Sequence, residues 1–97
     1  MNTALGLIET NGWVPMVQAA DAMAKTADVQ LIGWQKVGAG LVTIVVEGDV
    51  ASVQSAVSAG VVAAKKVGEV VAMHVIPRVD SGLRTLLPLR KLPRNPN

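Results

Sequence analysis

Two runs of β-branched and aromatic residues lie on either side of a short glycine-bearing link in the middle of this sequence. The runs are Gln30 to Lys36 and Leu41 to Val46, and the link is Val37-Gly38-Ala39-Gly40. Links of this length and composition join neighbouring antiparallel strands. The sequence therefore predicts a β-hairpin at its centre, and the rest of the fold has to be built around this hairpin.

Strand and helix patterns alternate on both sides of the hairpin. Before it, the apolar run Ala4 to Ile8 predicts a strand, and apolar residues at three-and-four spacing from Val14 to Ala27 predict a helix. After it, Asp49 is a good N-cap for a second helix, and Val70 to Ile76 predicts a last strand that Pro77 stops. The order β-α-β-β-α-β predicts a ferredoxin-like α/β domain of the α+β type, with both helices on one face of a four-stranded antiparallel sheet.

The segment after Pro77 differs in composition from the rest of the chain. It is rich in Pro, Arg and Leu, and residues Ser81 to Leu87 predict one short helix before Pro88. Beyond residue 83 there are four basic residues and no acidic residue; the basic ones are Arg84, Arg90, Lys91 and Arg94. We expect one domain over residues 1–88 and a basic, flexible tail over residues 89–97.

The composition favours close packing of small side chains. The chain has no Phe or Tyr, only two tryptophans, and an apolar content dominated by Ala and Val. Small side chains predict helices that lie close to the sheet, and Gly60 in the second helix indicates close approach of another backbone. The longest apolar runs are far shorter than the roughly 20 residues that a membrane-spanning helix needs. The start of the sequence lacks the pattern of a secretory signal, so we expect a cytosolic protein.

No group of residues in the sequence has the arrangement that catalysis requires. There is no cysteine and a single histidine, His74, so we expect no disulfide, no metal site and no cofactor. The acidic residues are scattered, and we expect no catalytic residue and no enzymatic activity. The segment Gly38-Ala39-Gly40 resembles the start of a phosphate-binding loop, but a strand follows it instead of a helix amino terminus.

Six short segments of the sequence match one known family in order and spacing. They are Ala4 to Thr10, Ala19 to Lys25, Lys36 to Thr43, Gly48 to Val50, Val67 to Val70 and His74 to Arg78. In these segments the chain resembles the hexamer-forming BMC-domain shell proteins of bacterial microcompartments, which include major shell proteins of carboxysomes and of propanediol- and ethanolamine-utilisation compartments. The resemblance covers about residues 3 to 88 and implies a structural role in the shell, in the bacterial cytoplasm. It implies homohexamers that form flat hexagonal tiles with other shell proteins around encapsulated enzymes, with no nucleic acid and no membrane as partner.

The resemblance places the central hairpin around the six-fold axis of such a tile. A central pore would then pass small polar or anionic metabolites, with Ala39 in the narrowest ring, where many relatives have Ser. Six copies of Lys36 would raise the positive potential near the axis and attract anions, unless each lysine pairs with a carboxylate. The pore-lining residues are expected to be Lys36, Val37, Gly38, Ala39 and Gly40.

The resemblance also implies which residues lie at the edge between hexamers. Lys25 and Arg78 match positions that meet their mates on the neighbouring hexamer across a two-fold axis. Asp28 lies near this edge, at a position that is often Asn in relatives. Val79-Asp80 stands where relatives often have Pro-His, so this chain departs from the family pattern at the same edge.

Two other hypotheses remain open on the sequence alone. The same fold suits a non-enzymatic regulatory oligomer whose hairpin holds a nucleotide or metabolite between subunits, which predicts saturable binding of a small molecule and no extended sheets. The basic tail suits a nucleic-acid arm, which predicts salt-dependent DNA binding that is lost on deletion of residues 89–97. No aromatic residue lies among the basic residues to stack on bases, which counts against this last hypothesis.

Overall fold

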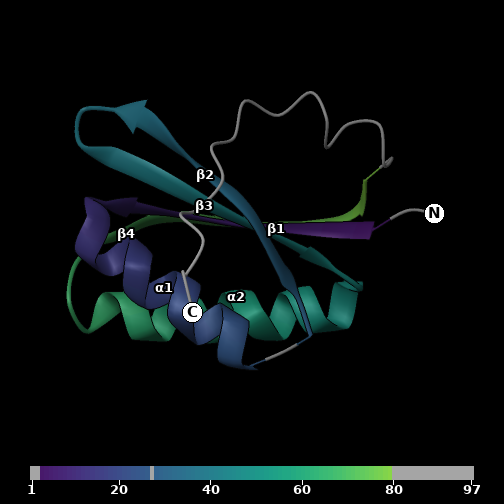
Figure 1. The fold of residues 1–97 in the computed structure, drawn as a ribbon. Coiled ribbons are helices and arrows are strands. Elements are labelled where there is room, and N and C mark those ends of the chain that lie inside the picture. The colour runs from purple at the N-terminus through teal and green to yellow at the C-terminus, as the bar shows by residue number, and fades with distance from the viewer. Residues whose placement is uncertain (1–2, 27, 80–97) are drawn as a thin grey trace, which may run out of the picture.

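Four antiparallel strands and two helices make up the part of the chain that the computed structural model describes, residues 3–26 and 28–79 (Figure 1). The predicted order β-α-β-β-α-β is confirmed. The short helix expected at Ser81 to Leu87 and the tail expected at residues 89–97 lie outside the described residues. The elements are β1 (Thr3–Asn11), α1 (Trp13–Thr26), β2 (Gln30–Gly38), β3 (Leu41–Gly48), α2 (Val50–Lys65) and β4 (Val70–Val79).

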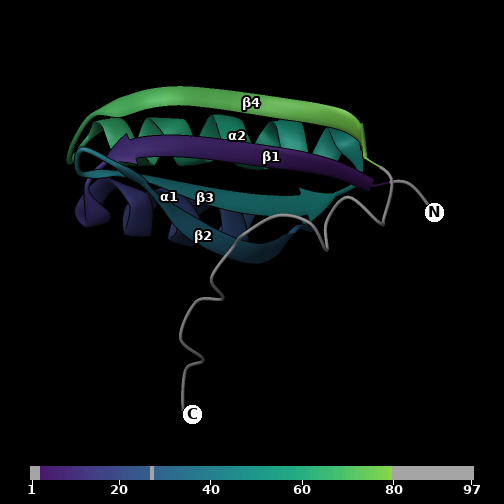
Figure 2. The ribbon, with the colours of Figure 1, turned by 90° about the horizontal axis from the view of Figure 1, so that it is seen from above.

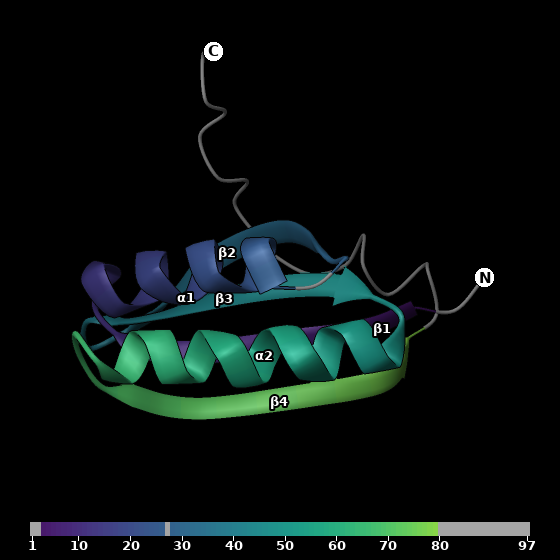
Figure 3. The same ribbon diagram turned by 90° about the horizontal axis from the view of Figure 1, so that it is seen from below.

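The strands form one sheet in the order β2-β3-β1-β4, so β2 and β4 are its two edges. Figure 2 shows these edges on opposite sides of the sheet. Both helices lie on the same face, with α1 towards β2 and β3 and α2 towards β4 (Figure 3). The predicted coverage of one face by two helices is therefore confirmed.

Small residues let the helices approach the sheet and each other closely. A Cβ atom added at Gly6 of β1 would lie 2.6 Å from Val57 of α2. A Cβ atom at Gly60 would lie 2.7 Å from Ile8 Cδ1 and 3.3 Å from the carbonyl oxygen of Ala19 in α1. The close backbone approach predicted at Gly60 is thus confirmed, and the contact between the helices depends on the missing side chain.

The start of α2 is fixed by the capping residue that the sequence indicated. Asp49 has an extended backbone conformation, and its carboxylate accepts hydrogen bonds from the Ser52 amide at 3.0 Å and from the Ser52 hydroxyl at 2.8 Å. These bonds stabilise the charged form and lower the pKa of Asp49 below its ordinary value. The cap satisfies one of the backbone donors that the first turn of a helix leaves unpaired.

The expectation that Pro77 stops the last strand is wrong, because β4 continues to Val79. Strand β4 lies at the edge of the sheet and pairs only with β1, so the missing N–H of proline does not interrupt a central ladder. The register between β1 and β4 also shifts between the pairs Leu5–Ile76 and Thr3–Val79. At the other end, β1 continues past the predicted end at Ile8 as far as Asn11, which pairs with Leu41 of β3.

Candidate functional site

The hairpin between β2 and β3 is confirmed, and it closes in a two-residue turn. Gly38 pairs with Leu41, which leaves Ala39 and Gly40 as the loop. Ala39 has a φ of +52° and Gly40 a φ of +81°, the two positive angles that a type I′ turn requires. Ala39 is the only non-glycine residue with a positive φ in the described part of the chain. All five residues from Lys36 to Gly40 are exposed.

The hairpin turn lies beside the ends of two other elements. A Cβ atom at Gly40 would lie 3.6 Å from Asn11 Oδ1 at the end of β1. The Asn11 backbone amide donates to the Glu69 carbonyl at 3.0 Å, and Asn11 Nδ2 donates to Glu69 Oε1 at 3.3 Å. The hairpin, the end of β1 and the α2–β4 turn therefore share one end of the sheet.

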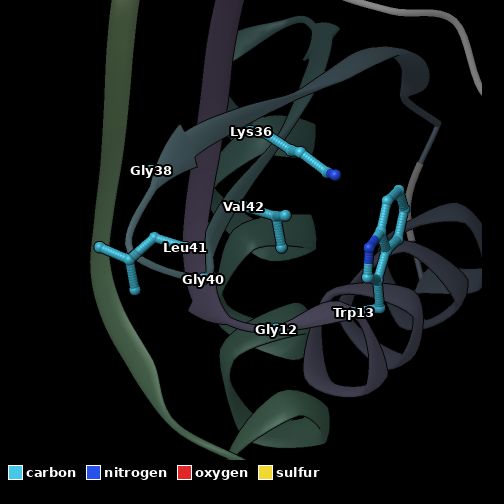
Figure 4. A pocket seen from close by; sticks show the side chains of 7 residues that line it. All are labelled: Gly12, Trp13, Lys36, Gly38, Gly40, Leu41 and Val42. Carbon is cyan, nitrogen blue, oxygen red and sulfur yellow. The ribbon is translucent and has the colours of Figure 1, made fainter.

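A pocket of about 350 Å³ lies between the hairpin and the start of α1 (Figure 4). In Figure 4 the side chains of Lys36 and Trp13 point towards one another across it. This pocket could not be predicted from the sequence, since Trp13 is far from the hairpin along the chain. The two tryptophans in a chain without Phe or Tyr were the available signal. The pocket is lined by Gly12, Trp13, Lys36, Gly38, Gly40, Leu41 and Val42.

The start of α1 is held from two sides. The Trp13 ring meets the ring of Trp34 in β2 edge-on, at a centroid distance of 4.5 Å. Pro15, in the first turn of α1, is buried, and a Cβ atom at Gly68 would lie 2.7 Å from its Cγ atom. The aromatic wall of the pocket is thus positioned by both β2 and the α2–β4 turn.

The residues expected at the hexamer edge lie at the opposite end of the sheet from the hairpin. Lys25, near the end of α1, is exposed, and its Nζ atom lies 3.0 Å from Asp21 Oδ2. Asp28 is exposed after α1, and a Cβ atom at Gly48, at the end of β3, would lie 3.1 Å from its carbonyl oxygen. Arg78 lies in the last part of β4, just before the Thr3–Val79 pair. Lys25 and Asp28 are thus close in the chain, whereas Arg78 comes from the other edge of the sheet (Figure 3).

The remaining candidate groups give no sign of a chemical site. In the range from residue 3 to 79, apart from residue 27, no three His, Asp or Glu residues are grouped so that they could hold a metal ion. His74 is exposed on β4. Neither of the two described helices is long and apolar enough to cross a membrane.

Comparison with known proteins identifies the family. The family model described as the BMC domain matches residues 4–79. This chain belongs to the BMC-domain family. It is 52% identical over 85 residues to the bacterial microcompartment shell protein PduA of Salmonella typhimurium, covering 88% of this chain and 90% of that protein. It is 49% identical over 92 residues to the carboxysome shell protein CcmK2 of Synechocystis, covering 93% and 89%.

A solved structure of a microcompartment protein supports the fold. The crystal structure of a microcompartment protein from Desulfitobacterium hafniense matches with a TM-score of 0.79 and 35% identity. The match covers 88% of this chain and 46% of that one, so this chain spans about half the length of that protein.

Membership of the BMC-domain family confirms the function that the resemblance implied. The relatives are shell proteins of bacterial microcompartments and carboxysomes, which are structural components and not enzymes. The chain is therefore a structural shell protein, and its predicted location in a microcompartment shell of the bacterial cytoplasm is confirmed with it. The alternative of a regulatory small-molecule-binding oligomer finds no support among these relatives.

Proposed function

We propose that this BMC-domain chain forms cyclic homohexamers that tile a facet of a microcompartment, with six hairpins around a central pore for small polar metabolites. The observation that supports this proposal most strongly is the placement of two groups of residues at opposite ends of one sheet. The exposed hairpin lies at one end, and Lys25, Asp28 and Arg78 lie at the other. A ring with its hairpins at the centre has the second group at its perimeter, where neighbouring tiles meet.

The hairpin suits the rim of a narrow opening. Its tip presents the Ala39 methyl group and backbone groups between two glycines, so six copies can approach one axis without bulky side chains. Backbone amides and carbonyls offer hydrogen bonds to polar solutes during passage. Val37 and Lys36 lie further from the tip on β2 and flank the opening. We propose these five residues, Lys36 to Gly40, as the pore lining.

The edge of the proposed tile combines two basic positions with one acidic position. Lys25 and Asp28 lie at and just after the end of α1, and both are exposed. Arg78 reaches the same end of the sheet through β4, which is long enough to do so because it continues past Pro77. We propose that these residues meet other hexamers and other shell proteins, which together enclose the enzymes of the compartment.

The assembly state of the purified chain tests this proposal directly. Native mass spectrometry gives the number of subunits, and negative-stain electron microscopy shows whether the particles form sheets or tubes. Hexamers that tile support the proposed function. A chain that stays monomeric, dimeric or trimeric and never tiles contradicts it.

A further inference from the structure

Exposed apolar side chains gather on two flanks of the fold, near the end that carries the hairpin. One flank is the start of α1, where Trp13 is 43%, Val14 63% and Val17 54% exposed. The other flank is the α2–β4 turn with β4, where Val67 is 47%, Val71 45% and Met73 46% exposed. Adjoining exposed apolar residues mark surfaces that bind other proteins. Two different flanks on one subunit suit a head-to-tail contact, which closes into a ring.

The two flanks lie at the same level along the sheet. The pocket residues Gly12 and Trp13 directly follow Asn11, and Asn11 is hydrogen-bonded to Glu69 in the α2–β4 turn. Figure 1 shows this turn and the hairpin at the same end of the molecule. If the hairpins surround an axis, the pocket on one flank and the α2–β4 turn on the other are equally far from that axis. Successive subunits then bring these two features face to face.

The first flank carries a lysine, and the second flank carries a carboxylate close to the two lysines at the end of α2. Lys36 points into the pocket (Figure 4), and the ion pair on helix α1 joins Lys25 to Asp21 and does not involve Lys36. Glu69 is exposed, and its Oε1 atom accepts the long 3.3 Å bond from Asn11 Nδ2. Within one chain Lys36 and Glu69 belong to opposite edges, because β3 and β1 lie between β2 and β4. Three strand spacings separate them by roughly 14 Å, too far for an ion pair.

We propose that the pocket beside the hairpin is completed by the α2–β4 turn of the adjacent subunit, and that Lys36 there pairs with Glu69 of the partner subunit. The contact also places Val71 of the partner subunit against the exposed edge of Trp13. This inference rests on the proposed hexamer, and it adds which surfaces of adjacent subunits meet. We call this contact between the pocket of one subunit and the α2–β4 turn of the next the seam. Six such pairs neutralise the six lysines near the axis. The backbone groups and methyl groups of the hairpin tip then determine which solutes pass through the pore.

Disulfide trapping tests the geometry, since the natural chain has no cysteine. In the double variant Lys36→Cys/Glu69→Cys, the two thiols of one chain are too far apart to form a bond. Mild oxidation should therefore link subunits head to tail and give a ladder of covalent species that ends at six on a denaturing gel. The matched control is Ala51→Cys/Glu69→Cys, because Ala51 is exposed at the far end of the sheet, in the first turn of α2. This control should give no such ladder.

Charge reversal tests the pair itself and does not depend on the cysteine variants. Lys36→Glu or Glu69→Lys alone should weaken each seam about fivefold, the effect of roughly 1 kcal/mol for an ion pair. The double reversal should restore the hexamer towards wild-type stability against dilution, measured by mass photometry. The proposed seam would be wrong if the protein forms hexamers but the cysteine variant gives no ladder, and if hexamers of the double reversal are no more stable against dilution than those of the single variants. The proposed hexamer itself would not be affected by these results. A wild-type chain that forms no hexamers would overturn the proposed function and the seam with it.

Discussion

Trp13 and Trp34 meet edge-on, with their ring centroids 4.5 Å apart and their planes at 66°. The contact joins the first residue of α1 to the middle of β2, and it is the one aromatic pair that this chain can form, because it has no Phe or Tyr. Trp34 is buried, whereas Trp13 stays half exposed at the wall of the pocket. The pair therefore stabilises the fold on one side and shapes the proposed seam on the other.

Replacing Trp13 with alanine should lower the free energy of unfolding by about 1 kcal/mol, since it removes an aromatic contact but only part of a buried side chain. It should also weaken the hexamer, because Trp13 is exposed towards the proposed seam. Urea unfolding followed by circular dichroism, at one fixed protein concentration, measures the first effect. Trp13→Phe is the control, and it should recover most of the loss. A Trp13→Ala protein as stable as the wild type would contradict the proposed role of the pair.

Gly60→Ala should destabilise the protein by about 1–2 kcal/mol, although alanine is the better helix former. The added Cβ atom would meet Ile8 at 2.7 Å and Met23 at 2.8 Å, and both residues are fully buried. Behind them lies the Ala19 carbonyl oxygen at 3.3 Å, which belongs to the backbone of α1. Thermal or urea unfolding measures the change. Ser58→Ala on the exposed face of the same helix is the control and should be neutral or slightly stabilising; a stabilised Gly60→Ala protein would show that the helices can move apart without cost.

Sequence patterns predicted the elements well where local chemistry decides them. Asp49 was recognisable as a cap, the glycines of the hairpin as a turn, and Gly60 as a point of close approach. The continuation of β4 through Pro77 was not predictable, because it depends on β4 being an edge strand, and strand order is a property of the whole sheet. The same reason explains why β1 keeps Asn11, whose partner Leu41 comes from a distant part of the chain.

The candidate site was likewise predictable only where its residues are close together in the chain. The exposed hairpin was predicted as a unit, since Lys36 to Gly40 are consecutive in the chain. The pocket was not predicted, because Trp13 reaches the hairpin only through the pairing of β1 with β3 and through its contact with Trp34. The opposite placement of Lys25 and the hairpin likewise follows from the direction of α1 along the sheet. Roles that depend on other copies of the chain remain predictions for all of these residues.

Ala39→Leu should slow the passage of metabolites without preventing hexamer formation. Six leucine side chains at the tip of the hairpins narrow the proposed opening, while the turn already accommodates a non-glycine residue at a φ of +52°. Substrate turnover by the enclosed enzymes of intact compartments measures the passage, and native mass spectrometry checks the ring. Ala39→Gly is the control at the same position; it removes the methyl group, relieves the left-handed backbone strain and should leave passage at least as fast. Equal turnover in both variants would show that solutes take another route.

Lys25→Ala should leave hexamers intact and abolish extended sheets. Lys25 is exposed and contacts Asp21 on its own helix, a surface ion pair worth about 0.5 kcal/mol at most, so the fold and the ring lose little. Negative-stain electron microscopy of the purified protein shows whether sheets remain. Asp21→Ala is the matched control, because it breaks the same ion pair but keeps the lysine, and its sheets should persist. Sheets formed by Lys25→Ala as readily as by the wild type would remove Lys25 from tile-to-tile contact.

The cap at Asp49 should make the stability of α2 depend on pH in the acid range. The hydrogen bonds from Ser52 lower the pKa of Asp49 below its unfolded value of 3.8, so the folded chain holds the proton more weakly than the unfolded chain. The stabilisation is therefore complete above that unfolded value and is lost as the pH falls through the lower folded value. Urea unfolding at a series of pH values from neutral to about 2.5 measures it. Asp49→Asn keeps an oxygen that accepts the Ser52 bond but carries no titrating proton, so the difference in stability between wild type and this variant should shrink as the pH falls. A difference that stays constant down to the lowest pH would show that the charge of Asp49 adds nothing to the cap.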